Sequence, residues 1–133
     1  MTARVANWPT VLHEQVEAAR LRPFVWGSWD CCQFVGEVVV ALTGRDQREL
    51  FPTYSTEDEA DAILAAHAGM HGLLERAFGP PIPVAFAKRG DIALVDLALG
   101  LQPGICLGSV CAAPGLKGLQ FVPMSMALAA WRV

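Results

Sequence analysis

The stretch that decides the fold lies at residues 24–31 and reads Phe24-Val25-Trp26-Gly27-Ser28-Trp29-Asp30-Cys31. It is an aromatic loop that ends at Asp30, a residue type that caps helices well, and an apolar run follows from Cys31 to Leu42. Apolar residues occur on more than one side of this predicted helix, so we expect it to be central and buried. Thr43-Gly44 then supplies a glycine C-cap.

Cys31 falls in the first turn of this predicted helix. The positive end of a helix dipole lowers the pKa of a thiol placed there and favours the thiolate. The alternative is that Cys31 and Cys32 are small buried apolar residues behind the Asp30 cap. Periodicity alone favours this alternative, because caps outnumber nucleophiles.

Helices are predicted on both sides of the deciding stretch, whereas strands are predicted only after residue 85. One helix begins at Trp8-Pro9 and ends at Arg22-Pro23, and another begins at the capping pattern Thr56-Glu57-Asp58-Glu59 and is interrupted by two glycines. Strands are predicted at residues 91–95, at 104–112 with a bend, and at 118–123, with an edge strand at 129–133. This order predicts an α+β fold in a single domain over residues 1–133.

Composition narrows the classes of function. Hydrophobic residues make up 53% of the 133 residues and charged residues 17%, which predicts a folded chain with some apolar surface. The net charge is −3 and no basic run occurs, so we expect no nucleic-acid binding. The uncharged window Leu97 to Leu116 contains two prolines and four glycines, which favours strands over a membrane span. No signal peptide is recognisable in residues 1–15, so export by such a signal is not expected.

No metal or cofactor is predicted. The four cysteines include an adjacent pair, which forms disulfides poorly, so we expect reduced thiols at Cys31, Cys32, Cys106 and Cys111. His67 and His71 have the spacing of helical metal ligands, but a lone pair of this kind is a weak signal.

Three blocks of the sequence resemble the NlpC-type family of papain-like cysteine peptidases. They are the deciding stretch continued to Val35, the segment Arg89-Gly90-Asp91-Ile92-Ala93-Leu94, and the segment Gly104-Ile105-Cys106-Leu107-Gly108. The blocks follow the family order. The resemblance implies a papain-like α+β fold, with N-terminal helices, the nucleophile cysteine at a helix N-terminus and an antiparallel sheet after it.

The resemblance also implies roles for four residues. Cys31 takes the nucleophile position, with Asp30 as the helix cap. Gln102 stands where the family has its histidine base, and Phe24 stands where it has an active-site tyrosine. Glutamine takes up no proton at neutral pH, so we interpret the site as degenerate and do not expect turnover.

Three functions are compatible with this interpretation. The first is a structural component of a phage tail tip or of tail assembly, bound to other tail-tip proteins in an oligomer, in the virion or in the host cytoplasm during assembly. The second is an active cysteine peptidase or amidase that cleaves peptidoglycan stem peptides during DNA entry. The third is a chaperone that never enters the virion.

Two further expectations concern apolar residues. We expect Trp26 inside and Trp29 nearer the surface. The mean hydropathy of +0.37 and the apolar stretches of residues 121–124 and 127–131 predict burial against a partner, with closure of the domain's own core as the equal alternative.

Overall fold

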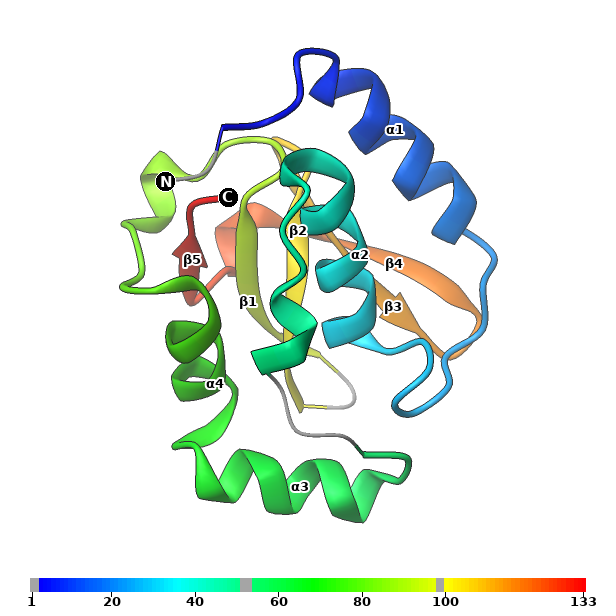
Figure 1. Cartoon of the computed structure of the whole chain (residues 1–133), viewed down its shortest axis with the longest axis vertical. Coiled ribbons are helices and arrows are strands. Elements are labelled where there is room, and N and C mark those ends of the chain that lie inside the picture. The colour runs from blue at the N-terminus through cyan, green and yellow to red at the C-terminus, as the bar shows by residue number, and fades with distance from the viewer. Residues whose placement is uncertain (1–2, 51–53, 98–99) are drawn as a thin grey trace.

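The computed structural model describes residues 3–50, 54–97 and 100–133, and the fold is α+β, as the sequence predicts (Figure 1). Helices come first along the chain. They are α1 (Trp8–Ala19), α2 (Cys31–Thr43), α3 (Glu57–Ala66) and α4 (Gly69–Phe78), with short 3-10 turns η1 (Gln47–Leu50), η2 (Val84–Phe86) and η3 (Met124–Met126). The strands are β1 (Ile92–Leu97), β2 (Gly100–Cys106), β3 (Val110–Gly115), β4 (Gly118–Pro123) and β5 (Ala129–Trp131).

Helix α2 forms the centre of the core. Its buried residues include Phe34, Val38 and Leu42, and the helix packs against β2 and β3. It begins at Cys31 and ends at Thr43, and the C-cap Gly44 has a left-handed φ of 77°. The predicted position of Cys31 in the first turn of a buried helix is therefore confirmed.

The strands form an antiparallel sheet in the order β4-β3-β2-β1-β5. The predicted edge strand at the C-terminus is present as β5, where Trp131 is fully buried and its indole Nε1 donates to the Gly79 carbonyl at 3.0 Å. Strand β2 begins earlier than the predicted Gly104. As a result Gln102 lies inside a strand, opposite Val95 of β1.

The break between α3 and α4 is sharper than an interruption within one helix. Ala68 has a φ of 60° and Gly69 a φ of 78°, so two successive residues leave the right-handed helical region. Helix α4 therefore leaves the line of α3, which extends along one end of the molecule (Figure 1).

The expectation for the two tryptophans is wrong. Trp29 is only 3% exposed, while Trp26 is half-buried. The backbones of Val25 and Trp29 pair in both directions, at 2.8 and 2.7 Å, and this tight turn holds the Trp29 ring against Phe34 of α2. The guanidinium of Arg22 covers Trp29, 3.8 Å from the ring centroid.

The uncharged window forms strands where it is described, with β2 and β3 falling inside it. Among the described residues no helix has the length and apolar character needed to cross a bilayer.

Candidate functional site

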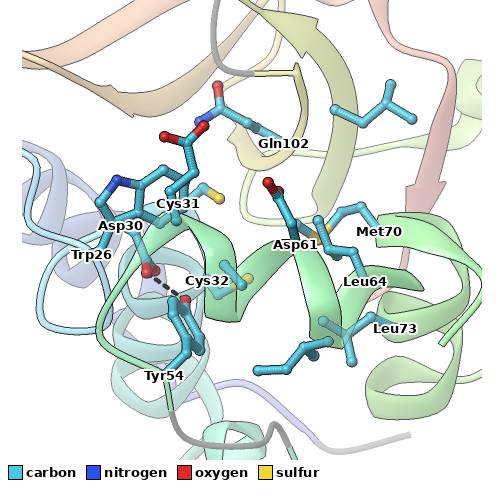
Figure 2. A pocket seen from close by; sticks show the side chains of 14 residues that line it. Trp26, Asp30, Cys31, Cys32, Tyr54, Asp61, Leu64, Met70, Leu73 and Gln102 are labelled. Carbon is cyan, nitrogen blue, oxygen red and sulfur yellow. Dashed lines mark hydrogen bonds between the residues drawn. The ribbon is translucent and has the colours of Figure 1, made fainter. Parts of the chain in front are cut away.

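A pocket lies where the N-terminus of α2 faces α3, the start of α4 and β2 (Figure 2). About 560 Å³ of empty space lies in it and at its mouth, open solvent included. Its polar lining comes from three carboxylates, two thiols, one amide and one phenol, namely Asp30, Glu57, Asp61, Cys31, Cys32, Gln102 and Tyr54. Its apolar lining includes Trp26, Leu64, Met70, Leu73 and Leu101.

The pocket brings together the two residues that sequence comparison singled out as nucleophile and base positions. Cys31 lies at the first position of α2 and Gln102 in β2, and both line the pocket. Figure 2 shows the Gln102 side chain extending toward Cys31. Phe24 is not among the lining residues. Its ring packs edge-on against Trp26 instead, with 4.8 Å between centroids.

Asp30 organises the N-terminus of α2. The residue is 1% exposed, and its carboxylate accepts from the backbone N–H groups of Gln33 at 3.0 Å and Gly27 at 2.9 Å. It also accepts from the hydroxyl of Tyr54. Three donors satisfy this buried carboxylate, as a buried charge requires.

The Cys31 thiol is held protonated, contrary to the expected lowering of its pKa by the helix dipole. A side-chain hydrogen bond with Cys32, burial, and the nearby charges of Cys32 and Asp30 raise the pKa of Cys31 well above its ordinary value. Together these effects outweigh the helix dipole.

Tyr54 is a hydrogen-bond donor and not a base. Burial, followed by the charge of Cys32 and the hydrogen bond to Asp30, raises the pKa of Tyr54. The phenol therefore keeps its proton at neutral pH.

The Gln102 amide is buried with one atom unsatisfied. Gln102 is 3% exposed, and its Oε1 has no hydrogen-bond partner in the part of the chain that the structure describes. An unpartnered buried acceptor costs about 1–3 kcal/mol, so this site lacks a donor that would stabilise it.

Histidines do not replace the missing base in the pocket. All three fall within the described ranges, and none is among the lining residues. His13 is exposed, the Nδ1 of His67 lies 2.8 Å from the Ile63 carbonyl, and the ring of His71 contacts Trp131. Among the residues that the structure describes, no three His, Cys, Asp or Glu side chains are placed so that they could hold a metal ion.

Comparison with family models matches residues 3–133 to a family described as "Domain of unknown function (DUF6950)". The chain belongs to this family. A comparison with curated proteins found no match. The pocket geometry is therefore the basis for assigning a function to this family member.

Sequence reasoning missed three residues of the pocket. Tyr54 is the single tyrosine of the chain, and it lies just before the helix predicted from Thr56, outside every motif named above. Glu57 and Asp61 lay in a predicted helix, where their spacing of four places them on one face. The sequence could have shown that this helix face is acidic. Its position opposite Cys31 depends on tertiary packing.

Proposed function

We propose that the chain is a papain-like domain of the NlpC type whose hydrolase site does not turn over, and that it serves as a structural or assembly component of a phage tail. The observation that carries the proposal is the presence of Cys31 and Gln102 in one pocket. The thiol position is kept, while the position of the base holds an amide. Proton transfer contributes about 10²–10⁴-fold to turnover, and an amide does not supply it.

The electrostatics of the pocket support the absence of turnover. The raised pKa of Cys31 keeps the thiol, not the nucleophilic thiolate, at neutral pH. The Asp30 carboxylate is fully engaged by its three donors and holds the loop and helix in place.

The arrangement of elements supports the papain-like assignment. A buried helix carries the cysteine at its N-terminus and packs against an antiparallel sheet, and the residue at the base position lies on a strand of that sheet. The helix with its cysteine and the antiparallel sheet are the parts of this arrangement that the resemblance implies. Support for a role in an assembly comes from large exposed apolar side chains, including Phe86 at 65% and Leu128 at 63% exposure.

An active cysteine peptidase that cleaves peptidoglycan stem peptides is the second candidate. The observation in its favour is the position of Cys31, which lines an open pocket at a helix N-terminus. The two candidate functions differ in whether activity requires the Cys31 thiol.

Complementation tests the structural role. A phage whose genome encodes the chain, with that gene disrupted, is supplied with either the wild-type chain or Cys31→Ala, and tailed particles are counted by electron microscopy. We expect both chains to restore tails equally, because the proposal gives the thiol no chemical step. Tails that assemble without the chain, or that require Cys31, would contradict the proposal.

A further inference from the structure

Helix α3 presents two unpaired carboxylates to the pocket. Glu57 and Asp61 lie one turn apart, both are exposed and both line the pocket. Neither side-chain carboxylate forms an ion pair or a hydrogen bond within the described ranges. No lysine or arginine is among the lining residues, so this side of the pocket carries uncompensated negative charge.

Gln102 gives an independent sign of a missing ligand. It lines the pocket and is only 3% exposed, and its Oε1 has no hydrogen-bond donor among the described residues. A half-turn of the amide would place Oε1 toward the pocket and Nε2 in the buried position. Figure 2 shows Asp61 and Gln102 on neighbouring sides of the cavity, near Cys31. In that orientation a ligand group bearing N–H donors would pair with the amide oxygen and with the carboxylates together.

The apolar lining of the pocket suits an alkyl chain attached to a ligand group that bears N–H donors. Leu64, Met70 and Leu73 supply aliphatic and thioether surface, and the half-buried indole of Trp26 offers an aromatic face. Long basic side chains bury their methylene stems in this way and keep the charged end among polar groups. Cations are also attracted to indole faces.

We propose that the pocket binds a cation carried on a short alkyl chain, the chemistry of a lysine or arginine side chain and of a free alkylamine. The inference rests on the proposed function, because it treats the former hydrolase site as a binding site. Glu57 and Asp61 would pair with the charge, Gln102 would accept one N–H, and the apolar wall would hold the stem.

The test uses the full chain and four small probes of similar size. They are n-butylammonium, n-butylguanidinium, the neutral 1-pentanol and the anionic pentanoate, titrated while NMR follows the tryptophan indole signals and the backbone amides. We expect the cations to bind about tenfold more tightly than 1-pentanol, and pentanoate to bind most weakly. N-acetyl-lysine methylamide then separates the two sources: binding as tight as n-butylammonium indicates a peptide side chain, and weaker binding indicates a free amine.

Matched variants locate the charge. We expect Glu57→Gln combined with Asp61→Asn to weaken cation binding about threefold to tenfold and to leave 1-pentanol binding unchanged. Asp58→Asn is the control, because Asp58 is an exposed carboxylate of α3 outside the pocket lining and its loss should change little. Equal binding of cations and 1-pentanol, no binding of any probe, or equal effects of the double variant and the control would overturn the inference.

A hydrolysis assay distinguishes failure of the cation-binding inference from failure of the proposed function. Cys31-dependent hydrolysis would overturn the proposed function without changing the cation preference. Loss of the cation preference would overturn the inference while leaving the absence of turnover in place.

Discussion

At the scale of single residues, the chemistry of the site depends on the protonation of Cys31. Its neighbour Cys32 provides the largest effect, through a hydrogen bond that favours the protonated thiol, and burial acts in the same direction. A group whose pKa is raised by folding stabilises the fold while it is protonated. That contribution is lost as pH rises above the ordinary thiol pKa of about 8.5 and toward the raised value.

Alkylation by iodoacetamide measures this protonation directly. We expect Cys31 in the folded chain to react at least about tenfold more slowly than a free thiol at pH 8, because only the thiolate attacks. Cys32→Ala removes the largest cause of the raised pKa, so the reaction of Cys31 should accelerate and its pH profile should move to lower pH. Mass spectrometry of the modified peptide identifies the site. A profile for Cys31 that does not change in Cys32→Ala would contradict this explanation.

At the scale of elements, Gly27 brings the aromatic loop into contact with two residues that line the pocket, Asp30 and Tyr54. Gly27 has a φ of 75° and donates its N–H to Asp30 at 2.9 Å. A Cβ at this position would overlap the backbone carbonyl of Tyr54. The loop, the cap of α2 and the Tyr54 segment are thus fitted to one another at a single point.

Two glycine-to-alanine substitutions separate the stability cost of a steric clash from the cost of a left-handed backbone. Gly44 has a φ of 77°, nearly the same as that of Gly27, but a Cβ there would meet nothing within 4 Å. We expect Gly44→Ala to lower the free energy of unfolding by about 1–2 kcal/mol, through the left-handed backbone alone. Gly27→Ala should cost about 1–3 kcal/mol more, because it adds a clash with the Tyr54 backbone. Urea denaturation measures both, and equal losses would show that the contact with Tyr54 is not tight.

Helix α2 illustrates what sequence can predict at this scale. Asp30, the apolar run and Gly44 are local signals, and the helix begins and ends where they predict. The early start of β2 was not predicted, because residues 100–103 include Gly100 and Pro103, residue types that strands disfavour, and they join the strand through hairpin pairing with the end of β1. The orientation of Trp26 and Trp29 likewise depends on the backbone pairing of Val25 with Trp29.

At the scale of the whole molecule, the pocket is assembled from segments that are distant in sequence. Sequence motifs placed Cys31 and Gln102 at related positions, and both line it. Tyr54, Glu57 and Asp61 belong to no catalytic motif, and the two carboxylates line the pocket because α3 faces the N-terminus of α2 and strand β2 across it. The charge of the site is therefore a tertiary property, whereas its thiol and amide are recognisable in the sequence.

The proposed function requires that this site does not turn over. Its most direct test is a hydrolysis assay that compares the wild-type chain with Cys31→Ala, using a peptidoglycan stem peptide and the acylating ester p-nitrophenyl acetate. Without a base beside a protonated Cys31, both proteins should release product at the same background rate from both substrates, with no burst of p-nitrophenol. Turnover or a burst that is present in the wild-type chain and absent in Cys31→Ala would contradict the account.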